Sequence, residues 1–180
     1  EADPSPALQQ VGGTWPVDAR TIGILADGST DLAALARIRA AVDAADMVPL
    51  VIAPQGGMLG GQIPVQRTYL TARSTEFDAI IVAGTGEYGT DAVDSLDAKA
   101  GNPAGHPAVD PRVAILLTEA YRHSKALGAW GSGAGVLGAS GIPEDAPGIL
   151  VESPEEIVPG LVTLLSRHRV WDRFPVAAAS

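Results

Sequence analysis

The residues of this chain whose types and spacing could do chemistry are concentrated in GAWGSGAGVLGASG, residues 128–141. Gly133, Gly135 and Gly138 form the string G-x-G-x-x-G, which binds the pyrophosphate of a dinucleotide when it joins a strand to a helix. Ser132 lies among small residues directly after an apolar run, where a nucleophile elbow would place an attacking hydroxyl. The sequence therefore suggests two alternative functions for this segment, dinucleotide binding and nucleophilic hydrolysis.

Dinucleotide binding has one feature in its favour and a stronger one against it. Glu152 ends the next expected strand 19 residues after Gly133, close to the ~20 residues that separate the glycines from a ribose-binding acid. However, Gly141 and Pro143 interrupt the segment between Gly133 and Gly148. A crossover helix needs roughly ten residues, and its first turn holds the pyrophosphate. We therefore predict no helix and no dinucleotide site in this segment.

Nucleophilic hydrolysis would use Ser132, and its flanking residues fit that role poorly. The elbow pattern G-x-S-x-G requires a glycine two residues before the serine, and Trp130 stands there. A serine also needs a base. His123 and His168 lie near the ends of expected helices, where the helix dipole favours a cation. His106, in a long loop, is the histidine that could reach the turn, so Ser132 with His106 forms the weaker, catalytic alternative.

The elements that must position this turn alternate between strands and helices. Short apolar runs predict strands at 21–26, 48–53, 78–84, 126–130 and 148–152, and a weaker alternation predicts a hairpin within 56–70. Helical periodicity follows the first, third and fifth strands, and residues 85–108 form a long loop. This order indicates an α/β fold: an open, doubly wound, mostly parallel sheet with helices on both faces.

Each expected helix has a starting signal. Ser29 or Thr30 is the expected N-cap of the first helix. Asp110 and Pro111 supply a cap and a proline at the first helical position of the second. Residues 153–156, SPEE, read as a capping box for the last helix.

Composition limits the classes of function. The chain has 180 residues, 46% hydrophobic and 18% charged, which suits a globular domain. The net charge of −9 argues against binding to nucleic acid or to an anionic membrane. The absence of cysteine excludes disulfides and thiolate chemistry. No apolar run reaches the length of a membrane span and no signal peptide is visible, so we expect a cytoplasmic protein.

The N-terminal residues differ in composition from the rest. Residues 1–20 hold three prolines and no sustained periodicity, which is typical of a linker or arm. Leu8 and Trp15 could attach it to a surface. We expect residues 21–180 to form the folded, flavodoxin-like domain.

The order of elements, the turn after ALGAW and the acidic turn DGSTD resemble the DJ-1/PfpI group within the class I glutamine amidotransferase-like fold, a three-layer sandwich. Active members carry a cysteine at the elbow, and the matching residue here is Gly131. They also carry a glutamate in the first helix, and the matching position is about Ala33, with Asp31 two residues away. The resemblance implies an empty elbow and no catalytic residues, so the group's chemistry is not expected. The alternative is a standalone hydrolase or glyoxalase that uses Ser132.

Three further stretches, SPALQQV, LTEAYRHSKALGAW and LLSRHRVWDRFP, are similar to the C-terminal domain of large-subunit (clade 2) haem catalases. This resemblance covers essentially the whole chain. It implies a parent protein that decomposes hydrogen peroxide and holds haem in its core. This chain would then bind no haem, because Tyr69, Tyr88 and Tyr121 lie outside any haem motif. The implied partners are the catalase core, neighbouring subunits and, through a chaperone-like surface, unfolded client proteins.

Charged residues outside the turn have simpler interpretations. We expect Asp27 and Asp31 to cap a helix rather than to form an acidic pocket. We expect the tail around Trp171 to be a packed anchor whose arginines pair with acidic neighbours, or a surface that docks on another domain. The acidic loop residues fit no calcium-loop spacing and are expected to be solvated; they are Glu87, Asp91, Asp94 and Asp97.

Overall fold

The computed structural model describes residues 12–85 and 109–174. Its main sheet has six strands in the order β5-β2-β1-β6-β7-β8, and every pairing between neighbours is parallel. The strands are β1 (Thr21–Leu25), β2 (Val48–Ala53), β5 (Arg67–Thr68), β6 (Ala79–Val82), β7 (Ala126–Ala129) and β8 (Ile149–Val151). The predicted open, doubly wound α/β fold is confirmed.

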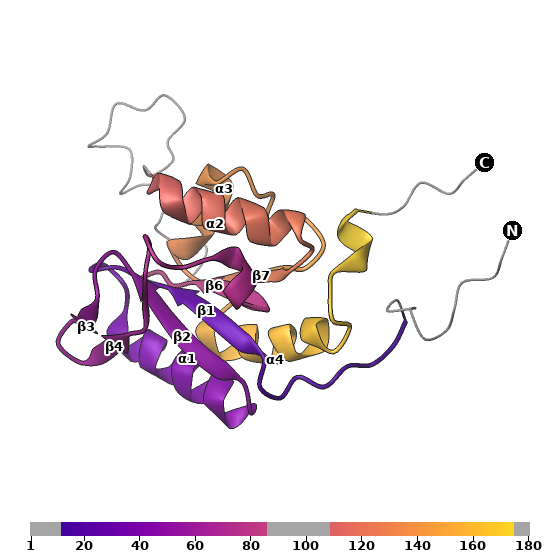
Figure 1. Cartoon of the computed structure of the whole chain (residues 1–180), viewed down its shortest axis with the longest axis horizontal. Coiled ribbons are helices and arrows are strands. Elements are labelled where there is room, and N and C mark those ends of the chain that lie inside the picture. Colours follow the sequence, from indigo (N-terminus) through magenta and orange to yellow (C-terminus); the bar gives the residue numbers. More distant parts are fainter. Residues whose placement is uncertain (1–11, 86–108, 175–180) are drawn as a thin grey trace, which may run out of the picture.

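Helices cover both faces of this sheet (Figure 1). α1 (Leu32–Ala44) and α4 (Pro154–Leu165) pack on one face, and α2 (Pro111–Arg122) and α3 (Gly133–Ala139) pack on the other. Two short 3-10 helices, η2 (Ser74–Glu76) and η3 (Trp171–Arg173), follow β5 and α4. The strand order reverses between β1 and β6, and in such sheets the carboxyl ends of the strands at the reversal are the usual binding place.

The central strands explain why the sheet is buried on both faces. Ile24 of β1 and Ile81 of β6 face α1 and α4, whereas Leu25 and Ile80 face α2 and α3. All four side chains are buried. Continuous apolar runs are what a strand needs when helices cover both of its faces.

The segment 56–70 forms the predicted hairpin and one element that the sequence did not predict. β3 (Gly57–Leu59) and β4 (Ile63–Val65) pair antiparallel. Gly60 and Gly61, with φ of 55° and 70°, make the turn between them, a conformation that strongly favours glycine. The two residues of β5 then pair with β2 at the edge of the main sheet.

The helix starts differ from the predictions at two of three places. The N-cap of α1 is Asp31, whose carboxylate accepts hydrogen bonds from the amides of Ala33 and Ala34 at 2.9 and 3.1 Å. The Thr30 hydroxyl instead accepts from the Asp27 amide and closes the preceding turn.

Of the other two helix starts, one agrees with its prediction and one does not. Asp110 caps α2 as predicted, with Pro111 at the first position. Ser153 begins α4 but its hydroxyl makes no capping hydrogen bond among the described residues, so the predicted capping box is wrong.

The prediction that no helix follows Gly133 is also wrong. α3 occupies Gly133–Ala139, and Gly141, at φ 75°, ends it while the Ile142 amide donates to the Leu137 carbonyl. Burial of Ala134 and Leu137 against the sheet stabilises a glycine-rich sequence that has little helix propensity of its own. At seven residues, α3 is still shorter than a typical crossover helix.

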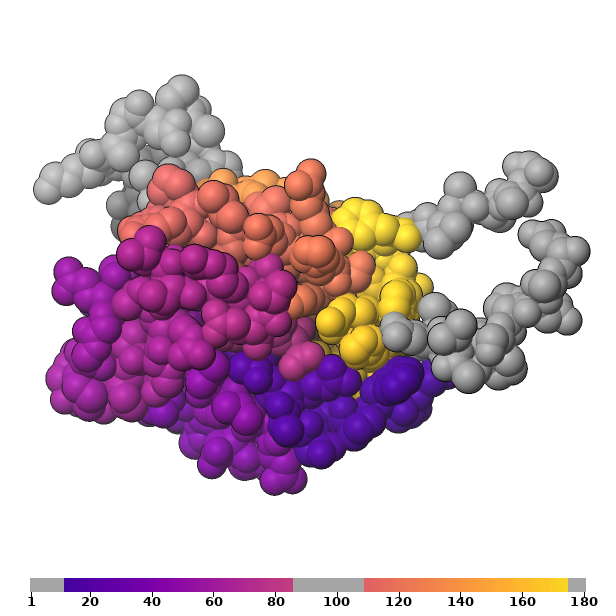
Figure 2. All heavy atoms as spheres, in the orientation of Figure 1, coloured from indigo at the N-terminus to yellow at the C-terminus, as the bar shows by residue number. Residues whose placement is uncertain are grey.

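Residues 12–20 precede β1 and contact the segment after α4; Figure 2 shows these two parts of the chain in indigo and yellow. The Trp15 amide donates to the Ser166 carbonyl at 2.7 Å, and the Ala19 amide donates to the Asp46 carbonyl at 2.7 Å. Trp15 therefore attaches this segment as expected, whereas Leu8 lies outside the described residues. No helix in the described part of the chain has the length and apolar character needed to cross a membrane.

Candidate functional site

The turn between β7 and α3 has the sharp geometry of a nucleophile elbow. Gly131 is buried, has a φ of 51°, and connects Trp130, which is 1% exposed, to the start of α3. A left-handed residue at the top of a strand is what presents a nucleophile in this kind of turn. Glycine supplies the conformation but has no side chain to attack with. We therefore keep the interpretation that the nucleophile position of this elbow, at Gly131, has no nucleophile.

Glycines also let the neighbouring turn approach the elbow. A Cβ on Gly84, which follows β6, would lie 2.3 Å from the Trp130 carbonyl oxygen and 2.4 Å from the Gly133 nitrogen. A Cβ on Gly133 would lie 2.4 Å from the Val82 carbonyl oxygen. Side chains cannot occupy either position without moving the backbone, so backbone contacts fix the shape of the elbow.

Ser132 is used to hold this turn together. Its hydroxyl oxygen accepts a hydrogen bond from the Thr85 amide at 3.0 Å, and its own amide donates to the Thr85 carbonyl at 3.1 Å. His123 ends α2 and His168 follows α4, which places both at the opposite edge of the sheet. His106 lies outside the described residues, so the pair Ser132 and His106 remains a prediction.

Beside the elbow lies a cavity of about 620 Å³, here called the elbow hollow, at the N-termini of α1 and α4. An ion pair of 3.4 Å between Arg37 and Glu155 joins the two helices across it. Of the described residues that line the hollow, three are acidic, namely Asp31, Glu152 and Glu155, and one, Arg37, is basic. This balance repels a pyrophosphate, and together with the short α3 it argues against dinucleotide binding.

The acidic residues near β1 have structural roles. The Asp31 carboxylate caps α1, and its amide donates to the Gly84 carbonyl at 3.2 Å. The Asp27 carboxylate accepts from the amide and hydroxyl of Ser29. The helix-capping interpretation is therefore confirmed for Asp31, whereas Asp27 holds the turn before α1 and caps no helix in the described part of the chain.

The described residues do not fit a metal ion or a haem group. Among residues 12–85 and 109–174, no three histidine, aspartate or glutamate side chains converge as a metal site requires. The Tyr69 hydroxyl donates to the Ala26 carbonyl at 3.0 Å, and the Tyr121 ring is covered by Arg173 and Phe174. Neither tyrosine lines a described cavity. The remaining tyrosine and the acidic loop residues lie outside the described residues; they are Tyr88, Glu87, Asp91, Asp94 and Asp97.

The opposite edge of the sheet collects cations around the C-terminal segment. Arg173 is 7% exposed, donates to the carbonyls of Pro147, Tyr121 and Lys125 at 2.9, 3.0 and 2.7 Å, and lies 4.4 Å from the centre of the Tyr121 ring. The Lys125 ammonium donates to the carbonyls of Ser74 and Phe77. Burial lowers the pKa of Arg173 to about 10 and also lowers the pKa of Lys125.

The prediction that the tail arginines pair with acidic neighbours is therefore wrong within the described residues. Arg173 and Arg169 donate to backbone carbonyl oxygens instead, Arg169 to that of His168. For Arg173 these acceptors are carbonyl groups before β8, near the end of α2 and just before β7, and the sequence alone cannot locate them.

His168 is not the helix-end cation that the sequence predicted. Its ring lies 5.6 Å from that of Trp15, and its Nδ1 lies 3.3 Å from an Arg20 nitrogen. Burial lowers the pKa of His168, and the charges of Arg169 and Arg20 lower it further against the opposing effect of Asp78. The imidazole is therefore neutral at pH 7 and accepts a hydrogen bond from Arg20.

Comparisons with known proteins match most of the chain to one family. A family model described as the C-terminal domain found in long catalases matches residues 18–175. Catalase HPII of Mycobacterium avium is 30% identical in an alignment that covers 94% of this chain and 25% of that protein. Catalase HPII of Pseudomonas putida is 29% identical, covering 97% and 23%, and catalase B of Aspergillus fumigatus is 28% identical, covering 89% and 22%. The chain thus spans about a quarter of the length of these relatives.

Proposed function

Because the chain belongs to the family of C-terminal domains found in long catalases, we propose that it is the non-catalytic C-terminal domain of a large-subunit haem catalase. The rest of that protein would hold the haem and decompose hydrogen peroxide. The family match from residue 18 to residue 175 is the observation that carries this proposal. The folded domain would begin near residue 21, with the preceding residues joining it to the core.

The elbow supports a non-catalytic role for the domain. The turn keeps the geometry that presents a nucleophile, but Gly131 occupies the position and Ser132 is bonded to Thr85. The resemblance to the DJ-1/PfpI group extends to this turn and not to a reactive side chain. We infer that the domain acts by burying surface against the catalase core and neighbouring subunits, which stabilises the assembled protein.

The isolated 180 residues test this proposal when they are mixed with haem and with hydrogen peroxide. We expect no Soret band and no peroxide decomposition above the buffer rate, because neither Tyr69 nor Tyr121 lines a described cavity. The intact long protein, assayed in parallel, is the positive control. A Soret band or peroxide decomposition by the isolated chain would contradict the proposal.

A hydrolase or glyoxalase is the second candidate, because Ser132 lies in an elbow turn and is partly exposed. It predicts an esterase or glyoxalase activity that Ser132→Ala abolishes and that Ser140→Ala, at the other end of α3, leaves intact. Our leading proposal predicts that the wild-type chain has neither activity.

A chaperone-like surface is a third role compatible with a non-catalytic domain. It predicts that the chain suppresses the aggregation of a heated client protein at a near-stoichiometric ratio. Unchanged light scattering of the client would remove this role and leave the stabilising role in place.

A further inference from the structure

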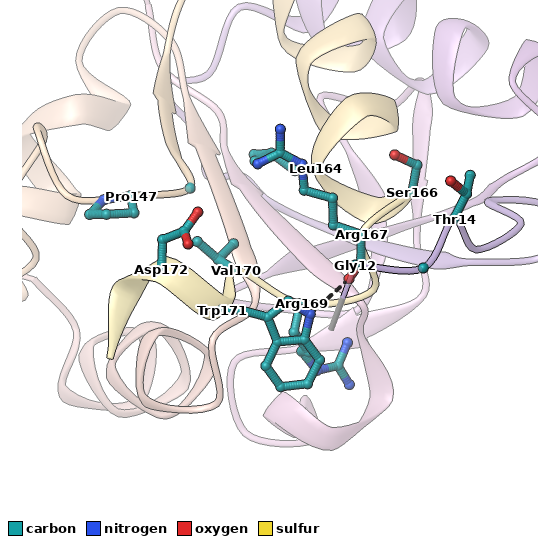
Figure 3. Close-up of a pocket in the computed structure, with 12 residues that line it drawn as sticks. Gly12, Thr14, Pro147, Leu164, Ser166, Arg167, Arg169, Val170, Trp171 and Asp172 are labelled. Carbon is teal, nitrogen blue, oxygen red and sulfur yellow. Dashed lines mark hydrogen bonds between the residues drawn. The ribbon is translucent and has the colours of Figure 1, made fainter. Parts of the chain in front are cut away.

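A second cavity lies at the amino edge of the sheet, where the two ends of the described chain meet (Figure 3). We call it the arginine hollow, and its volume is about 570 Å³. One wall is the start of the described chain, one is the loop before β8, and the third is the segment from the end of α4 to η3. Its lining residues are Gly12, Gly13, Thr14, Pro147, Gly148, Leu164, Ser166, Arg167, Arg169, Val170, Trp171 and Asp172.

The arginine hollow differs from the rest of the domain in charge. The chain as a whole carries −9, and four arginines elsewhere are paired with carboxylates. Arg167 and Arg169 line the hollow, and neither forms an ion pair with a carboxylate of the described residues. Among the described residues that line the hollow, Asp172 is the one carboxylate. The hollow therefore holds a local excess of positive charge on an acidic domain.

The backbone around these arginines is held in place. The Trp171 indole nitrogen donates to the Arg167 carbonyl at 3.1 Å, drawn as the dashed line in Figure 3. The Val170 amide donates to the Ser124 carbonyl at 2.8 Å, and the buried Arg173 fixes the next turn. The hollow is thus a preformed surface, which reduces the entropy lost when a partner binds it.

Its position indicates where a partner would come from. Gly12, Gly13 and Thr14 form one wall, and the next residue, Trp15, is bonded to Ser166. In a C-terminal domain, the rest of the polypeptide joins the chain on this side. Any surface of the preceding domain that lies near the junction is held at a high effective concentration beside the hollow.

We propose that the arginine hollow binds a carboxylate-bearing surface segment of the domain that precedes this chain in the long polypeptide. This inference rests on the proposed function. The guanidinium group binds carboxylates through paired hydrogen bonds, and interfaces between domains of one chain are commonly polar. Arg167, whose side chain extends toward Leu164, would supply these bonds from one side of the hollow, and Arg169, which lies beside Trp171, would add its charge from the other (Figure 3).

In the experiment, the photo-reactive residue benzoylphenylalanine replaces Asp172, numbered as in this chain, within the long protein. The cross-linked peptide is then identified by mass spectrometry. We expect a peptide of the preceding domain that is rich in aspartate and glutamate. As a control, benzoylphenylalanine replaces Met58, an exposed residue of the β3–β4 hairpin, and should give no such product.

Charge variants then test the mechanism of binding. Arg167→Glu should lower the cross-link yield by about fivefold or more, since it replaces attraction by repulsion. Arg167→Lys should keep most of the yield. Arg122→Glu, which changes an exposed arginine at the end of α2, should leave it unchanged. Thermal melting of each variant confirms that it is folded.

Several outcomes would overturn the inference. These are a product with a second copy of this domain, a product with a segment poor in carboxylates, and a yield that Arg167→Glu leaves unchanged. Each can occur in a protein that is a long catalase, so the proposed function would survive them. A native polypeptide no longer than this chain would remove both proposals together.

Discussion

Arg173 shows how a single residue fixes the C-terminal segment to the domain. Its guanidinium lies among the ends of α2, β7 and the loop before β8, and bonds to three carbonyl oxygens. Its Nε and Nη1 make these three hydrogen bonds, whereas Nη2 has no hydrogen-bond partner among the described residues. The motif HRVWDRFP marks this residue in the sequence, but it gives no sign that the partners are carbonyls.

Replacing Arg173 should therefore destabilise the domain. We expect Arg173→Ala to cost about 3 kcal/mol of unfolding free energy, because it leaves buried carbonyl groups without donors. Arg173→Lys should recover only part of this loss, since an ammonium cannot reproduce the planar fork. Urea unfolding measures both, with Arg122→Ala as the exposed control expected to change stability by less than about 0.5 kcal/mol. Equal stability of all three variants would contradict this role.

The close approach at the elbow gives a second test on single residues. Gly84→Ala should destabilise by about 2 kcal/mol or more, because its Cβ would overlap the Trp130 carbonyl and the Gly133 amide. Gly28→Ala is the matched control, as no atom lies within 4 Å of its Cβ. Urea unfolding should separate the two variants, and a neutral Gly84→Ala would show that the elbow is less tightly packed than described.

His168 should make stability depend on pH in a defined direction. Its pKa in the folded protein is lowered by burial, then by Arg169 and Arg20, whereas in the unfolded chain it is about 6.5. The unfolded chain therefore takes up a proton that the folded chain does not, so stability is complete above about pH 6.5 and falls as the pH decreases toward the folded pKa.

His168→Asn tests this dependence, because asparagine tolerates the φ of 68° at this position. We expect the variant to lose part of the decrease in unfolding free energy that the wild type shows below about pH 6.5. His123→Asn, at the exposed end of α2, is the control. A slope unchanged in His168→Asn would mean that other groups cause the dependence.

At the scale of elements, the sequence predicted the strands better than the helix ends. Runs such as 21–26 and 78–84 had to be buried strands because both faces are apolar. The N-cap of α1 was predicted one or two residues early, since Ser29, Thr30 and Asp31 are all good caps and only the backbone selects among them. α3 was missed because its stability comes from packing against the sheet and not from propensity.

Capping provides a test at this scale. Asp31→Ala should cost about 1 kcal/mol, because two amide donors at the start of α1 lose their acceptor. Ser153→Ala should be nearly neutral, since its hydroxyl makes no capping bond among the described residues. Thermal unfolding of both variants checks the pair, and the reverse order of stability would contradict the assigned caps.

At the scale of the whole molecule, the two ends of the described chain lie together at the amino edge of the sheet, and the elbow lies at the carboxyl edge (Figure 1). The sequence located the elbow from a strand followed by small residues. It could not locate the arginine hollow, because residues 12–14 and 164–172 meet only in the folded chain. This separation places the proposed contact with the catalase core opposite the empty elbow.

The central claim is that this chain is one domain of a long catalase, and the size of the native polypeptide tests it most directly. An antibody raised against the 180 residues should be used to blot an extract of the source cells under denaturing conditions. We predict a single band at about four times the 18.3 kDa of this chain, because the chain spans about a quarter of its relatives. A band near 18.3 kDa, with none at higher mass, would contradict the account.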